Sequence, residues 1–103
     1  MKEPDKKIVL DLDRDRIRTV ILEAYSICRD FLDTEFLITE DQFVSQINPY
    51  LDSNRVTTPV QLELPCKKYP GMRLDVDLRR QKVFARLFPK EKQAQLNYML
   101  KGL

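Results

Sequence analysis

Residues 73–88 read RLDVDLRRQKVFARLF, and this stretch decides the fold. On both sides of the polar tetrad at 79–82, apolar residues alternate with charged or aromatic ones, which is the period of a strand that buries one face. Two such runs around a polar tetrad predict an antiparallel β-hairpin. Because the tetrad contains neither Asn-Gly nor any glycine, we expect a loose tip rather than a tight primed turn.

The same alternation predicts the register of the hairpin. If Leu78 faces Val83 on the buried side, Asp75 lies directly opposite Arg86 on the other side, so that a carboxylate meets a guanidinium. A shift by one residue would turn Arg86 toward the core. Burial and charge therefore favour the same alignment.

Helical periodicity flanks the hairpin on both sides. Apolar residues recur at intervals of three and four over 14–32, and Asp13 is available as the N-cap of that helix. After the hairpin, Pro89 opens a last helix that Gly102 can terminate. The apolar stripe of this last helix comprises Leu96, Met99, Leu100 and Leu103.

A shorter helix is predicted between them from local capping chemistry. Thr39 and Gln42 have the spacing of a capping box, which starts a helix. Pro49 disfavours helical geometry in the residue before it, so this helix should end near Ile47. Residues 52–54 are polar and predict a turn.

Two further segments have the composition of strands. Residues 8–12 form a short β-rich run. Residues 57–64 begin like a helix but alternate like a strand at their apolar positions, and Pro65 leaves too little room for a useful helix. We therefore predict a strand in each segment.

The predicted order is strand, helix, helix, strand, strand, strand, helix, which is typical of an α+β domain with helices packed on a mostly antiparallel sheet. We expect a flexible segment at 1–7 and a single domain over 8–103. A winged helix is the alternative, with the basic hairpin as its wing. That fold needs a recognition helix near Thr58, which the acidic Glu63 and the following proline oppose.

Charge divides the chain of 103 residues into two halves. Residues 1–54 hold 7 basic and 12 acidic side chains, a balance of −5, whereas residues 55–103 hold 11 and 4, a balance of +7. A basic half of this kind either attracts a polyanion or is neutralised by the acidic half within the fold.

Several function classes find no support in the sequence. The chain has no histidine, and Cys28 and Cys66 lack a metal-binding spacing, so no zinc site is expected. The acidic residues at 11–15 lie among arginines and are better explained by a helix N-cap than by a metal site. The only glycines are Gly71 and Gly102, which excludes a glycine-rich phosphate loop. We predict no enzyme, no cofactor, no catalytic residue and no small-molecule substrate.

We predict instead a small binding or regulatory domain, with nucleic acid as the first candidate partner of the basic half. Arginines beside aromatic side chains on an exposed sheet are how proteins hold single-stranded nucleic acids. No apolar run is long enough to span a membrane and no secretory signal begins the chain, so we expect a cytoplasmic protein without membrane contact. The candidate binding residues are Lys67, Lys68, Arg73, Arg79, Arg80, Lys82, Phe84, Arg86, Lys90 and Lys92.

Two alternatives compete with this prediction. The last helix could cover Phe84 and Phe88, which would leave the arginines as a solvated rim. The helix at 14–32 carries more apolar residues than one buried stripe requires, so it is either a fully buried central helix or supplies apolar contact area to a homodimer or to a partner protein, in which case the basic half would meet an acidic protein. The second case would make the chain a protein-interaction or regulatory subunit.

Overall fold

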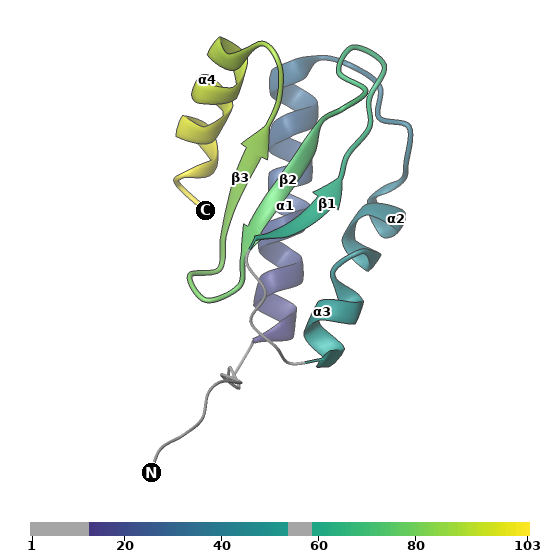
Figure 1. The fold of residues 1–103 in the computed structure, drawn as a ribbon, viewed down its shortest axis with the longest axis vertical. Coiled ribbons are helices and arrows are strands. Elements are labelled where there is room, and N and C mark those ends of the chain that lie inside the picture. Colours follow the sequence, from purple (N-terminus) through teal and green to yellow (C-terminus); the bar gives the residue numbers. More distant parts are fainter. Residues whose placement is uncertain (1–12, 54–58) are drawn as a thin grey trace.

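The computed structural model describes residues 13–53 and 59–103, and it confirms an α+β fold. The elements are α1 (Arg14–Leu32), α2 (Glu40–Ser45), α3 (Asn48–Ser53), β1 (Val60–Glu63), β2 (Arg73–Asp77), β3 (Lys82–Arg86) and α4 (Lys90–Leu100), as Figure 1 shows. The flexible segment predicted at 1–7 and the strand predicted at 8–12 lie outside the described residues.

Helix α1 has the bounds that its periodicity predicts. The side chain of Asp13 caps it by accepting a hydrogen bond from the backbone N–H of Arg16 at 3.0 Å. The helix ends where Asp33 adopts a left-handed conformation (φ 49°) and its N–H donates to the carbonyl of Arg29. Seven residues of α1 are buried, whereas Thr19 and Glu23 on another side are exposed. The prediction of a helix buried on all sides is therefore wrong.

The capping box of α2 is present, but the chain that follows departs from prediction. Thr39 and Gln42 exchange side-chain to backbone hydrogen bonds of 3.1 and 2.8 Å. Helix α2 ends at Ser45, close to the end predicted near Ile47, but a further helix, α3, starts at Asn48, so the turn predicted at 52–54 is wrong for the described residues. Proline fits the first turn of a helix, where its missing N–H would have no intrahelical partner.

The three strands form an antiparallel sheet in the order β1-β2-β3. The hairpin exists as predicted, but its register differs by two residues: Val76 faces Val83, and Asp75 faces Phe84. The turn begins after Asp77, earlier than the predicted pairing of Leu78 with Val83 requires. It begins there because the carboxylate of Asp77 accepts hydrogen bonds from the N–H groups of Arg79 and Arg80, at 3.1 and 3.2 Å. A shift of two residues leaves every side chain on its predicted face.

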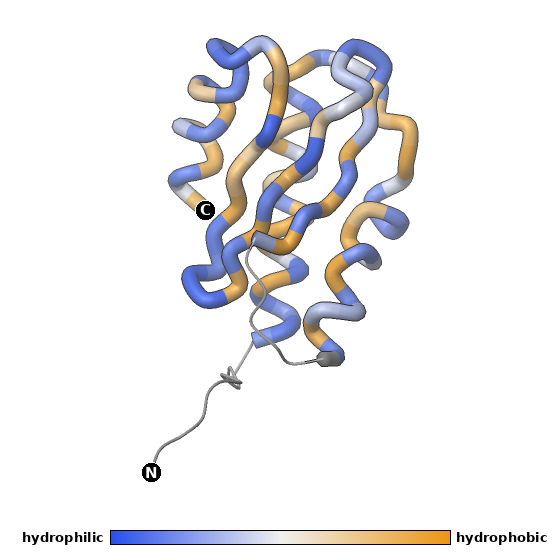
Figure 2. Tube along the Cα trace, in the orientation of Figure 1, coloured by the Kyte–Doolittle hydropathy of each residue, from blue (hydrophilic) through white to orange (hydrophobic). Residues whose placement is uncertain are grey.

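Helix α1 packs against one face of the sheet, and the other face has no helix over it in the described part of the chain (Figure 1). The strands alternate between apolar and polar residues, as the colours of Figure 2 show. Helix α4 contributes Leu96 and Leu100 to the core, but Met99 is 43% exposed, so the predicted stripe is narrower than expected. The segment that a winged helix would use for recognition is strand β1.

Both outer strands are bordered by a side-chain amide that pairs with their backbone. On β1, Gln46 accepts from the N–H of Glu63 and donates to its carbonyl, both at 2.8 Å. On β3, Asn97 of α4 accepts from the N–H of Ala85 at 2.6 Å and donates to its carbonyl at 3.3 Å. These contacts satisfy backbone groups that an edge strand otherwise leaves open.

Candidate nucleic-acid interface

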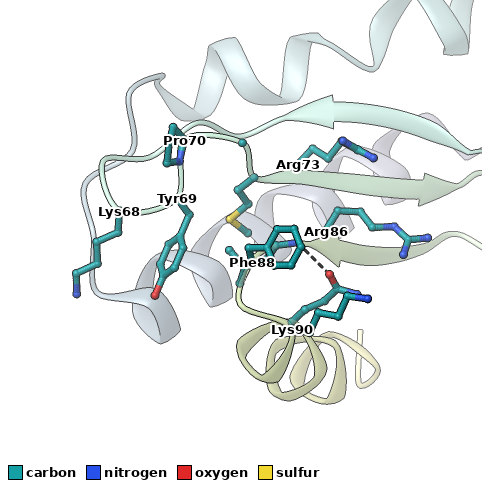
Figure 3. A pocket seen from close by; sticks show the side chains of 11 residues that line it. Lys68, Tyr69, Pro70, Arg73, Arg86, Phe88 and Lys90 are labelled. Atoms are coloured by element: carbon teal, nitrogen blue, oxygen red, sulfur yellow. Dashed lines mark hydrogen bonds between the residues drawn. The ribbon is translucent and has the colours of Figure 1, made fainter.

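A groove of about 400 Å³ lies at the end of the sheet opposite the hairpin tip. Figure 3 shows the loop between β1 and β2 on one side of it and the two arginines on the other, with Phe88 between them. We call it the basic groove, and the charged and aromatic residues that line it are Lys68, Tyr69, Arg73, Arg86, Phe88 and Lys90.

The two arginines of the groove share one carboxylate. Asp75 is buried, with a side chain 5% exposed, and accepts a hydrogen bond from Nε of Arg86 at 2.7 Å. Nε of Arg73 lies 3.7 Å from its other oxygen, which has no hydrogen-bond partner. The predicted contact between Asp75 and Arg86 is thus present, although the two residues are diagonal rather than opposite neighbours.

The basic groove keeps a positive charge. Its four cations face one carboxylate, Asp75, which leaves a net charge of +3. Among the described residues, one ion pair joins the acidic half to the basic half, that of Glu35 with Lys67 at 2.9 Å, and Lys67 does not line the groove. In the described residues, the ion pair between the two halves therefore does not neutralise the cations of the basic groove.

The aromatic side chains of the hairpin are open to solvent. Phe84 is 41% exposed and Phe88 is 76% exposed. The prediction that the last helix covers them is wrong, because α4 runs along the edge of β3, where Asn97 binds Ala85 and Gln93 binds the N–H of Leu87. Phe84 lies on the same face of β3 as Arg86, and Phe88 lines the basic groove together with both arginines.

The candidate residues of the hairpin tip lie apart from the basic groove. Arg86 in the groove and Lys82 at the tip are the two ends of β3, four residues apart, which corresponds to about 14 Å. At the tip, Arg80 lies 3.9 Å from Asp77, and Nζ of Lys82 donates to the backbone oxygen of Leu103 at 2.8 Å. Arg79 is exposed. The tip is a second, smaller basic cluster.

Lys92, like Lys67, lies outside the groove, with its ammonium 5.4 Å from the centre of the Phe31 ring. The structure therefore brings together four of the ten predicted residues, Lys68, Arg73, Arg86 and Lys90. Sequence reasoning left Tyr69 out and did not count Phe88 among the binding residues. Their signal was local: Tyr69 adjoins Lys68 before the Pro70-Gly71 turn.

Other candidate chemistry is weak in the described part of the chain. Cys28 and Cys66 are buried, and burial raises the pKa of Cys28 to about 12. The pKa of Cys66 is also raised by burial, so neither thiol is a reactive thiolate at neutral pH. Residues 13–53 and 59–103 contain no cluster of metal-binding side chains.

A second groove, of about 660 Å³, lies on α1 away from the sheet. It is lined by Leu22 and Ile27 together with Glu23 and Glu40. This is the surface that the alternative of a protein partner would use. Because of its carboxylates, an acidic partner would have to be held by the basic half, with this groove supplying apolar contact area.

Comparisons with protein-family models, curated proteins and solved structures give no match for this chain. None of the helices in the described residues is both long and apolar enough to cross a membrane.

Proposed function

We propose that this domain binds single-stranded nucleic acid in the basic groove. The observation that carries the proposal is the convergence of four cations and two aromatic rings from two stretches of the chain, 68–73 and 86–90. Cations neutralise phosphates, and exposed aromatic rings stack on unpaired bases. A groove of about 400 Å³ is large enough for one nucleotide but does not enclose a strand.

The arginines support phosphate binding by the way they are held. Arg86 donates to Asp75 through Nε, which leaves the two terminal amino groups of its guanidinium available for a phosphate. Arg73 approaches the same carboxylate through Nε. A buried carboxylate that orients two guanidiniums reduces the freedom they would otherwise lose when a phosphate binds.

Binding can be measured by fluorescence anisotropy with a labelled single-stranded oligonucleotide at about 50 mM salt, where phosphate contacts are strong. The groove variant is Lys68→Ala with Lys90→Ala. Its matched control is Lys67→Ala with Lys92→Ala, because these lysines are close in sequence and carry the same charge but do not line the groove.

We expect the groove variant to weaken binding about tenfold and to reduce the salt slope by roughly 1.4, which corresponds to two lost phosphate contacts on a single strand. The control should stay within about twofold, since its charges lie elsewhere. Equal losses in both variants, or no binding at micromolar protein, would refute the proposal. Equal competition by polyglutamate would instead favour an acidic protein partner.

A further inference from the structure

The solvent face of β3 alternates between aromatic and cationic side chains. On β3 itself the residues of this face are Arg86, Phe84 and Lys82, with Val83 and Ala85 buried between them, and Phe88 follows two residues after the end of the strand, in the basic groove. Alternate residues of a strand are about 6.8 Å apart. This spacing is close to the distance between successive phosphates in an extended single strand.

Charge across the sheet favours a path over β3 rather than β1. On the same outer face, β1 carries Gln61 and Glu63, both exposed, and no cation. Strand β3 carries the cation Arg86 there, while the ammonium of Lys82 at the end of the strand donates to the backbone oxygen of Leu103. A polyanion is therefore repelled on the β1 side and attracted on the β3 side.

The row of aromatic and cationic side chains on β3 ends at a second set of cations, at the hairpin tip. Arg79 and Arg80 are exposed at the hairpin tip, beyond Lys82. Phe84 lies midway between the tip and the groove, with 41% of its surface exposed. From Lys82 to Arg86 the strand spans about 14 Å, and with Phe88 two residues beyond its end the row has room for about four nucleotides at this spacing.

We infer that a bound single strand runs along β3 from the basic groove to the hairpin tip, with one base stacked on Phe88 and another on Phe84. This inference rests on the proposed function and adds the path and the length of the bound strand. Arg86 then holds a phosphate between the two stacked bases, and Arg79 and Arg80 hold the far end.

The test is a series of oligothymidylates of about 2 to 10 nucleotides, titrated by anisotropy against four proteins, with Phe84→Tyr as a fifth that restores the ring. These are the unmodified protein, Phe84→Ala, Arg79→Ala with Arg80→Ala, and Tyr98→Ala. Tyr98 is the matched control because it is an aromatic residue of α4 that is 79% exposed and does not lie on β3.

We expect affinity to rise steeply up to about four nucleotides and slowly beyond. Phe84→Ala should weaken binding of the tetranucleotide about fivefold or more, as expected for the loss of one stacked base, and leave the dinucleotide unchanged. Phe84→Tyr should restore binding, because the ring remains. The tip variant should weaken only the strands of about four nucleotides or longer.

The two proposals fail in different ways. If no oligonucleotide binds, the proposed function is wrong. If strands bind but the dinucleotide and tetranucleotide have equal affinity, or Phe84→Ala acts no more than Tyr98→Ala, the path along β3 is wrong while the groove remains a binding site.

Discussion

Replacing Asn97 by alanine should destabilise the domain through the loss of one side chain's two backbone contacts. Asn97 satisfies both the N–H and the carbonyl of Ala85 on the outer edge of β3. Ala85 has no solvent exposure, so water cannot replace the amide without a rearrangement of α4. The two backbone groups would then remain buried without partners.

The expected magnitude follows from these two bonds. A buried polar group left without its partner costs roughly 1–3 kcal/mol, and the 2.6 Å bond to the N–H contributes more than the 3.3 Å bond to the carbonyl. Alanine is the better helix former by about 0.5 kcal/mol, which offsets part of the loss. We expect a decrease of about 2 kcal/mol in the free energy of unfolding, or roughly 8–16 °C in Tm.

Urea denaturation followed by circular dichroism measures this difference. The control is Gln95→Ala, two residues away on the same helix and exposed, which should change the stability by less than about 0.5 kcal/mol. Hydrogen exchange adds a local readout, because the amide of Ala85 should lose protection in Asn97→Ala. If the two variants have the same free energy of unfolding, the contacts of Asn97 with the backbone of Ala85 do not stabilise the domain.

Three further predictions test the packing. Gln46→Ala removes two hydrogen bonds of 2.8 Å to the backbone of Glu63, but water can replace them because Glu63 is exposed. Urea denaturation should show a decrease of about 0.5–1 kcal/mol in the free energy of unfolding. A decrease as large as that of Asn97→Ala would contradict the role of burial. Thr39→Ala breaks the capping box of α2 and should lower the stability by about 1 kcal/mol in the same assay, whereas an unchanged midpoint would show that the box is dispensable. Burial raises the pKa of Cys28 from 9.0 to about 12, so the contribution of the neutral thiol to the free energy of unfolding is complete below pH 9 and is lost as the pH rises toward 12. The free energy of unfolding should fall by about 1.4 kcal/mol per pH unit in that range. Cys28→Ala should show a shallower slope than the unmodified protein.

Much of the fold follows from periodicity and capping in the sequence. The bounds of α1 and the pairing of β2 with β3 come from local patterns, and the structure confirms both. The register of the hairpin does not follow, because a pattern of period two cannot distinguish alignments that differ by two residues. The turn decides between them, through the backbone contacts of Asp77.

The candidate site is harder to predict because it depends on tertiary proximity. Lys68 and Lys90 are far apart in sequence, and they meet because the loop after β1 and the start of α4 converge at one end of the sheet. Lys67 adjoins Lys68 and Lys92 lies two residues from Lys90, but Lys67 contacts Glu35 and Lys92 contacts the ring of Phe31. A count of charges in the sequence cannot distinguish the lysines that line the groove from the lysines that do not, because the fold decides where each side chain lies.

The two amides that border the sheet differ in when they become available during synthesis. Gln46 precedes its partner Glu63 by 17 residues, so it has already emerged when β1 is made. Asn97 follows Ala85 by 12 residues, so the nascent hairpin has an open edge until α4 is complete, an interval of about 1–2 s at ordinary translation rates. An open edge strand can pair with a neighbouring chain. Until α4 docks, the edge of β3 at Ala85 therefore remains a place where a newly made molecule can pair with another chain.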